Sequence, residues 1–168
     1  SITLKNSDES LEVDLIICAT GWEQKFHYIP QDFVEANLEE DGIYLYRDIV
    51  HPDLPSMGFI GWISTFCSPL SAHLQSYWLL EHFNRSLTLP NRREIDEYIR
   101  ESKQFKRKHY QFGTQRSTFS QRYFWVYFDL LLNDLGFSPE LQAPSERLKA
   151  LAYAPIAKHY ENKGAKLQ

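Results

Sequence analysis

The sequence predicts an α/β fold, and three observations support this prediction. Residues 13–20 form a nearly continuous β-rich apolar run that ends at Gly21, which is typical of a strand buried on both faces in a parallel sheet. Residues 57–62 form a second short apolar run, whose glycines permit the close approach of another backbone or a ligand. Three longer downstream segments have the apolar periodicity of helices.

The buried strand over residues 13–20 needs neighbouring strands and covering helices. A right-handed crossover unit takes about 30 residues, and too few residues precede this strand to supply one. Either the neighbouring strands come from downstream, or they belong to sequence outside this chain. We favour the second interpretation, and we therefore expect the chain to be a piece of a longer protein. The unpaired strand also predicts poor solubility or self-association of the isolated chain.

The other strands and turns are short. Alternating polarity predicts strands at residues 2–5 and 43–47, and turn residues follow the first of them. The mixed composition of residues 24–40 predicts a loop with a short helical turn.

Four helices are expected after these strands. Proline suits the first turn of a helix, so Pro69 and Pro90 mark the start of two of them. A third is rich in aromatic residues and leucine, which predicts burial on several sides, and Gly136 is placed to end it. The predicted helices cover residues 69–83, 90–109, 119–133 and, near the end of the chain, 145–151.

The composition excludes several classes of protein. With 168 residues, 43% apolar and 15% aromatic, the chain is long and apolar enough to bury a core and is unlike a disordered protein. A net charge of −4 argues against a nucleic-acid partner. No run approaches the roughly 20 apolar residues of a membrane span. Cys18 and Cys67 lie in apolar sequence and are interpreted as reduced core cysteines, which favours a cytoplasmic protein.

Familiar catalytic motifs are absent from the sequence. The seven glycines form neither kind of phosphate-binding loop, and the six histidines show no metal-ligand spacing. Asp48 and Asp53 are interpreted as loop or capping carboxylates. The basic run at residues 103–109 is interpreted as a solvated helix face, with a phosphate or nucleic-acid site as the alternative.

A family resemblance begins at residues 14–22, which read Asp-Leu-Ile-Ile-Cys-Ala-Thr-Gly-Trp. This segment resembles the Ala-Thr-Gly-Tyr segment of flavin-containing monooxygenases and their N-hydroxylating and Baeyer–Villiger relatives. The resemblance continues in order along the chain. Similar segments are Leu45-Tyr46-Arg47, Pro52 to Pro55, Phe59-Ile60-Gly61, Gln75 to Trp78, Leu89-Pro90, residues 116–132 and the closing region at Tyr153 to Gly164.

Three features depart from the family's pattern. Trp22 stands where tyrosine is common, and the hydrophobic C-terminal anchor of vertebrate members has no counterpart here. Both Gly-rich dinucleotide loops of the family would lie upstream of the Ala-Thr-Gly segment. The chain therefore looks like the C-terminal third of such an enzyme, and its expected partner is the N-terminal two-thirds of the same protein.

The resemblance implies a fold and a domain organisation. The chain would be part of a flavoprotein fold with two dinucleotide-binding domains, namely the C-terminal part of the FAD domain with a helical tail. Residues 1–22 would end the NADPH domain and cross back, residues 23–90 would complete the FAD domain, and residues 91–168 would form a helical extension.

The resemblance also implies a reaction. NADPH would reduce FAD, and oxygen would give a C4a-hydroperoxyflavin that oxygenates a soft nitrogen or sulfur centre, or a ketone, of a small nucleophilic substrate. The cofactor carries this chemistry, and the protein positions it and excludes water. The isolated chain is expected to be inactive.

Residues 61–71 are expected to face the flavin ring. They combine a strand end with glycine, a polar loop and a helix start, whose N–H groups favour the negative charge of a reduced flavin. Ser64, Thr65 and Ser68 would hydrogen-bond the ring and Phe66 would pack on it, with ordinary loop and capping roles as the alternative.

Two further assignments follow from the resemblance. Four residues would lie beside the nicotinamide nucleotide: Ala19, Thr20, Gly21 and Trp22. Arg116 is a candidate contact to the NADP phosphate. No catalytic side chain and no metal ligand is assigned.

A non-catalytic role is the alternative function. The chain would then be an interaction module or a separate subunit derived from such an enzyme. The aromatic segment Phe119 to Phe128 would be its binding face, since large exposed apolar patches mark interfaces.

Overall fold

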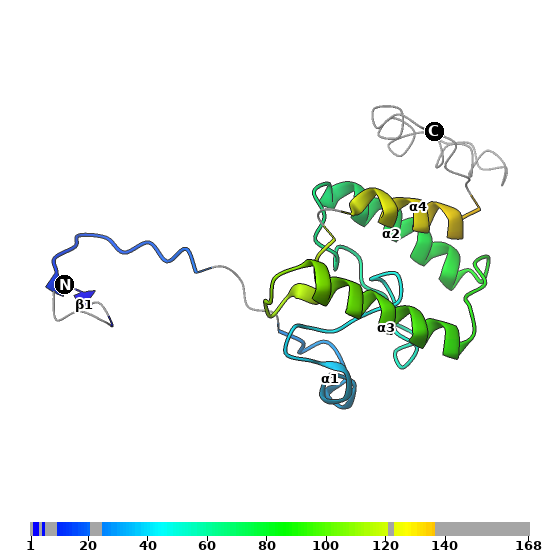
Figure 1. The fold of residues 1–168 in the computed structure, drawn as a ribbon, viewed down its shortest axis with the longest axis horizontal. Helices are drawn as coiled ribbons and strands as arrows, with labels where there is room; N and C mark the ends of the chain where they lie inside the picture. Colours follow the sequence, from blue (N-terminus) through cyan, green and yellow to red (C-terminus); the bar gives the residue numbers. More distant parts are fainter. Residues whose placement is uncertain (1, 4, 6–9, 21–24, 121–122, 137–168) are drawn as a thin grey trace. The chain divides into compact units, whose positions relative to one another are not determined.

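The computed structural model describes residues 2–3, 5, 10–20, 25–120 and 123–136 of the chain. The chain divides into two compact units, residues 1–30 and residues 31–168 (Figure 1). The second unit contains the four α-helices of the described residues. The predicted helix at residues 145–151 lies outside the described residues.

The first unit contains a small antiparallel sheet. Strand β1 (Ile2–Thr3) pairs with β2 (Ser10–Leu11), so that Ile2 lies opposite Leu11 and Thr3 opposite Ser10. The predicted strand at residues 2–5 is confirmed in its first half.

The prediction of a buried strand over residues 13–20 is wrong for this structure. These residues belong to neither strand, and their side chains are exposed, Ile17 to 80%. A strand needs the backbone of a neighbour to accept its hydrogen bonds, and no described residue pairs with this segment. Cys18 is exposed with the rest of the run, so its predicted core position is wrong as well.

The second unit begins with helix and continues with closely spaced turns. Helix α1 (Gln31–Asn37) is the short helical turn that the sequence predicted within residues 24–40. Residues 43–50 are almost entirely buried, but they form isolated bridges, Tyr46 with Val50 and Val50 with Gly58, instead of a strand. The predicted strands at residues 43–47 and 57–62 are therefore reduced to single bridges. Arg47 and Asp48 have positive φ angles of 54° and 55°, which turns the chain back after two residues.

The long helices agree with the sequence. Helix α2 (Ser68–Phe83) has proline in its first turn. Helix α3 (Arg92–His109) begins with a reciprocal capping box between Asn91 and Glu94. A 3₁₀ turn, η1 (Arg116–Thr118), precedes helix α4 (Phe124–Asp134).

Helix α4 starts five residues later than predicted. Phe119 instead forms a parallel bridge with Ser64, which keeps the chain extended there. Gly136 follows the helix with a φ of 80°, a left-handed conformation that suits glycine after a helix end.

One hydrophobic core joins α2, α3, α4 and the turns before them. Trp78 and Phe128 are its largest fully buried side chains, and Tyr46, Ile63 and Ile95 pack in the same cluster. Residues on both sides of position 90 thus share one core. The domain boundaries at residues 22 and 90 stay predictions.

Burial also bears on the proposed aromatic binding face. Phe128 and Tyr127 are buried in the core, while Val126 is 57% exposed. Tyr127 and Phe128 therefore pack inward, whereas the other described aromatic residues of this segment are half-buried. The role of the segment as a binding face stays a prediction.

Among the residues that the structure describes, no helix has the length and apolar character needed to cross a membrane.

Candidate functional site

The loop predicted to face a flavin begins at Gly61, whose backbone is hydrogen-bonded to a side chain of α2. The Gly61 backbone N–H donates a hydrogen bond of 2.7 Å to Oε1 of Gln75, a fully buried α2 residue. Gly61 has a φ of 76°, and a Cβ added there would meet no atom within 4 Å. The positive φ angle of Gly61 therefore explains the glycine here, since neighbouring atoms leave space for a Cβ. Gly58 differs, because a Cβ there would lie 2.3 Å from Leu79 Cδ1, so its glycine serves close packing on α2.

The middle of the loop is fixed by main-chain hydrogen bonds. The Ser64 N–H donates to the Thr118 carbonyl at 2.7 Å, and the Ser120 N–H donates to the Ser64 carbonyl at 3.0 Å. Ser64 is therefore held between the loop and the segment before α4, with its side chain half-buried.

Hydroxyl groups organise the start of α2. The Ser68 hydroxyl donates to the Thr65 carbonyl at 2.9 Å, and the Thr65 and Ser71 hydroxyl oxygens lie 2.5 Å apart. Thr65 is buried, so its hydroxyl belongs to this internal pair. Cys67 is the N-cap residue of α2, but no side chain caps the helix through a hydrogen bond.

The exposed part of the loop carries groups whose chemistry is compatible with a flavin ring. Phe66 is 84% exposed and Ser68 is also exposed beside the uncapped helix start. This set offers an aromatic surface, a hydroxyl group and N–H donors, which suit a flat heteroaromatic ring with anionic character. Among the four predicted loop residues, Phe66 and Ser68 are exposed, Ser64 is half-buried and Thr65 is buried.

The predicted nicotinamide-side residues lie in the first unit. Ala19 and Thr20 are exposed in its extended segment. Gly21 and Trp22 lie outside the described residues.

A buried polar chain connects Gly61 to two distant segments. Gln75 Nε2 donates to the Tyr127 hydroxyl at 2.7 Å and lies 3.4 Å from the Asp48 carbonyl oxygen. The Tyr127 hydroxyl donates in turn to the Arg47 carbonyl at 2.9 Å. Burial raises the pKa of Tyr127 well above its ordinary value, so this hydroxyl keeps its proton.

Trp78 of the same helix takes part in a second polar cluster. Its Nε1 donates to Asp134 Oδ2 at 2.9 Å, and Asp134 also pairs with the Arg47 guanidinium. The guanidinium lies over the rings of Tyr46 and Tyr98, 4.9 and 4.7 Å from their centroids. Hydrogen bonds and an ion pair therefore connect the segment around Arg47 with Gln75 and Trp78 of α2 through Tyr127 and Asp134 of α4.

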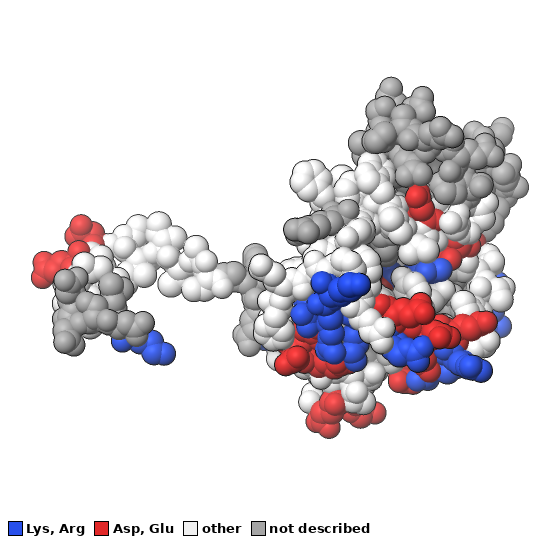
Figure 2. All heavy atoms as spheres, in the orientation of Figure 1, with Lys and Arg blue, Asp and Glu red and all other residues white. Residues whose placement is uncertain are grey.

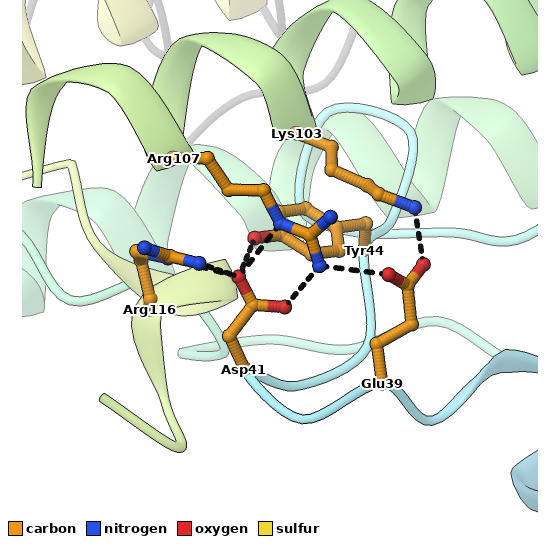
Figure 3. A network of polar contacts seen from close by, with 6 residues as sticks. All are labelled: Glu39, Asp41, Tyr44, Lys103, Arg107 and Arg116. Carbon is orange, nitrogen blue, oxygen red and sulfur yellow. Dashed lines mark hydrogen bonds and ion pairs between the residues drawn. The ribbon is translucent and has the colours of Figure 1, made fainter. Parts of the chain in front are cut away.

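A third polar cluster surrounds Asp41, a fully buried carboxylate (Figure 3). Arg107 binds both carboxylate oxygens, at 2.7 and 3.0 Å, Arg116 donates to Oδ2, and the Tyr44 hydroxyl donates at 2.8 Å. Hydrogen bonds from Arg107 hold the pKa of Asp41 well below its usual range, against the opposing effect of burial. Burial, together with the bond to Asp41, raises the pKa of Tyr44 to about 12.

This cluster gives Arg116 a structural partner. Its guanidinium is buried and points at Asp41, which neutralises it. The hypothesis that Arg116 contacts a phosphate therefore receives no support from its position here.

The basic run on α3 is not simply a solvated face. Lys106 is only 4% exposed, and its ammonium donates to Asp48 Oδ1 at 2.6 Å and to the Ser117 carbonyl at 2.5 Å. Lys103 and Arg107 pair with Glu39. Figure 2 shows the resulting surface, on which basic and acidic side chains lie beside one another. Lys103, Lys106 and Arg107 thus join α3 to residues 39–48.

A cleft of about 380 Å³ opens between α3 and α4. The Asp48–Lys106 pair lies at this cleft, and its walls are mainly apolar. None of its lining residues belongs to the loop at residues 61–71. The lining residues are Asp48, Tyr98, Glu101, Ser102, Phe105, Lys106, Phe119, Ser120, Tyr123, Val126, Tyr127 and Leu130.

Sequence reasoning missed the residues that hold the loop. Gln75 was noticed only as part of a motif, and Tyr127 only as part of an aromatic helix. One signal was present: Gln75 lies between Leu74 and Trp78 on the apolar face of α2, where a buried amide needs partners. Tyr127, 52 residues further on, had no comparable signal.

Comparisons with known proteins give a consistent result. The profile of a family described as "Flavin-binding monooxygenase-like" matches residues 1–152. Flavin-containing monooxygenase 1 of Mus musculus is 26% identical over 144 residues, covering 85% of this chain and 27% of that protein. A protein of Arabidopsis thaliana named "Probable flavin-containing monooxygenase 1" is 29% identical over 141 residues, covering 77% of this chain and 25% of that protein.

A more distant relative carries the cofactor in its name. An FAD-dependent monooxygenase of Aspergillus sclerotiorum is 22% identical over 187 residues, covering 82% of this chain and 32% of that protein. No solved structure matches the chain significantly. The chain spans about a quarter to a third of the length of these relatives. Because the family profile covers most of its residues, the chain belongs to the flavin-binding monooxygenase-like family.

Proposed function

We propose that this chain is the C-terminal part of an FAD- and NADPH-dependent monooxygenase that acts on soft nitrogen or sulfur centres, or on ketones. Family membership and the flavin-containing or FAD-dependent relatives support the flavin monooxygenase. The full-length protein would contain two dinucleotide-binding domains, with their glycine-rich loops outside this chain. When bound, the flavin would supply the oxygen-activating chemistry, and the protein would orient it and exclude water.

One observation supports the loop as the flavin-facing part of this chain. Phe66 and Ser68 are exposed at the uncapped start of α2, while the backbone of the same loop is fixed at Gly61 and Ser64. A rigid backbone with outward-facing aromatic and hydroxyl groups is what ring binding requires. Phe66 would pack on the ring, and Ser64 and Ser68 would hydrogen-bond it. Thr65 would contribute by shaping the helix start through Ser71.

The test uses the full-length protein. Phe66→Ala and Ser68→Ala, alone and with Thr65→Ala, should lower flavin content after desalting and slow NADPH oxidation. The matched controls are Phe112→Ala and Ser76→Ala, which remove an exposed phenyl ring and an exposed hydroxyl elsewhere in the same unit. Flavin content and NADPH oxidation that stay unchanged in all the loop variants would overturn the proposal.

The isolated chain gives a second test. We expect no bound flavin after mixing with FAD and desalting, because no segment of this sequence forms a pyrophosphate-binding loop. Stoichiometric retained flavin would show that the main anchor of the cofactor lies in this chain.

A further inference from the structure

The loop at residues 61–71 depends on a directional chain of buried hydrogen bonds. At one end, the Gly61 N–H can only donate, so the Gln75 amide must present its oxygen to it. The Gln75 nitrogen then points to Tyr127, whose hydroxyl oxygen must accept. The Tyr127 proton is left for the Arg47 carbonyl, which can only accept. The Gln75 nitrogen also lies 3.4 Å from the Asp48 carbonyl oxygen. Three main-chain groups thus fix the orientation of both side chains between them.

Burial makes this chain difficult to replace by water. Gln75 is 0% exposed and Tyr127 is 4% exposed. A buried amide that loses one partner keeps an unsatisfied group or rotates to find another. Rotation of Gln75 would turn an N–H group toward the Gly61 N–H, and these two donors repel each other. Loss of the Tyr127 hydroxyl would therefore weaken the hydrogen bond between Gln75 and the Gly61 N–H.

Gly61 is well placed to pass such a change to the loop. Its φ of 76° sets the direction in which the chain leaves the core, three residues before Ser64 and five before Phe66. The next fixed point is the pair of hydrogen bonds that joins Ser64 to Thr118 and Ser120. Between these two points Ile63 is anchored in the core, and the Gly61 N–H bond sets the direction in which the loop begins.

We propose that Gln75 and Tyr127 are positioning residues that orient the loop at residues 61–71 toward the flavin. This inference rests on the proposed function of the loop. Tyr127 of α4 forms its hydrogen bonds with Gln75 and the Arg47 carbonyl. The inference therefore gives α4 an indirect role in setting the geometry around the flavin ring.

Tyr127→Phe in the full-length protein is the main test. It deletes one hydroxyl group and retains the ring that fills the core. We expect FAD to dissociate about three- to tenfold more readily, as expected for one lost buried hydrogen bond. We also expect a shifted long-wavelength flavin absorbance band and a larger fraction of NADPH oxidised with release of hydrogen peroxide instead of product. Gln75→Leu should show the same changes, more strongly.

Tyr44→Phe is the matched control. Tyr44 is also a buried tyrosine, and its hydroxyl donates to the Asp41 carboxylate, so its removal costs at least as much stability. A merely structural role of Tyr127 would make the two variants alike. We expect Tyr44→Phe to keep the flavin spectrum and the coupling of NADPH oxidation to product.

The outcomes separate this inference from the function on which it rests. If Phe66→Ala and Ser68→Ala change flavin binding but Tyr127→Phe matches Tyr44→Phe, the positioning role is wrong and the flavin-facing loop is retained. If none of the loop variants changes flavin binding, the proposed function of the loop fails and the positioning role fails with it. Changed spectra in Tyr127→Phe alone among the two tyrosine variants would support the inference.

Discussion

Arg47 and Asp134 form a bidentate ion pair across 87 residues of sequence, with Nε–Oδ2 and Nη2–Oδ1 distances of 2.8 and 2.9 Å. The pair joins the turn after Tyr46 to the last residue of α4, and Trp78 Nε1 completes it from α2. Asp134 hydrogen bonds help keep the pKa of Arg47 above its ordinary value, against the effect of burial, so the guanidinium stays charged.

Arg47→Lys should therefore be a costly substitution. A lysine ammonium cannot form the two parallel hydrogen bonds or lie flat over Tyr46 and Tyr98. We expect a loss of about 1–3 kcal/mol in the free energy of unfolding, measured by urea denaturation of the chain. Arg92→Lys is the control, since Arg92 also binds both oxygens of a carboxylate, Asp96, but on an exposed surface. Equal effects in the two variants would contradict the role given to burial.

Asp41→Asn should remove a pH-dependent part of the stability. The folded protein holds the pKa of Asp41 well below its unfolded value of about 3.9. The stabilisation from the charged carboxylate is thus complete above that value and is lost as pH falls below it toward the folded pKa. We expect Asp41→Asn to cost about 3 kcal/mol near neutral pH.

The difference between the two proteins should shrink in acid. Urea midpoints measured from neutral pH down to about pH 2 give this comparison directly. A difference that stays constant below about pH 4 would show that Asp41 carries no such linkage.

Gly58→Ala tests the close packing of residue 58 on α2. The added Cβ would lie 2.3 Å from Leu79 Cδ1, so side chain and helix must move apart. We expect a loss of about 1–3 kcal/mol, measured as a lower urea midpoint. Gly113→Ala, where a Cβ meets nothing within 4 Å, should be neutral or slightly stabilising. The double variant Gly58→Ala with Leu79→Ala should cost less than the sum of the two single changes.

Ile17→Lys tests the exposed apolar segment of the first unit. Leu15, Ile16 and Ile17 are each more than half exposed in an extended conformation that pairs with no described strand. Such segments associate with each other, and a lysine opposes strand pairing. We expect light scattering to show larger assemblies for the unmodified chain than for Ile17→Lys. Phe112→Lys makes the same kind of change at an exposed site in the second unit and should leave the size of the assemblies unchanged. An unmodified chain that is monomeric in solution would contradict the expectation.

The sequence was most informative about helices, because their signals are local. Pro69, Pro90 and Gly136 mark helix ends through nearest neighbours, and the structure places two helix starts and one end within two residues of them. The strands were less predictable. Residues 13–20 have the composition of a buried strand, but pairing depends on backbone partners that no described residue provides.

The sequence indicated a polar loop before α2, but it did not indicate the residues that support this loop. A hydroxyl at position 127 and an amide at position 75 have no local pattern that indicates their contact, since they meet only after α2 and α4 pack together. The same is true of Lys106, whose neighbours in sequence indicate a surface helix. Its partner Asp48 could be assigned only once the turn at residues 47–48 was seen.

That two-residue turn has a consequence for recombining this chain with its relatives. Arg47 is tied to Asp134 on α4, and Asp48 is tied to Lys106 on α3, so the two adjacent residues hold two different helices. Both adopt left-handed backbone angles, which cost about 1–2 kcal/mol each for residues other than glycine. A crossover between α2 and α3 would take the turn from one parent and both ion-pair partners from the other. Chimeric proteins should therefore keep residues 39–136 from a single parent and place their junctions before this stretch.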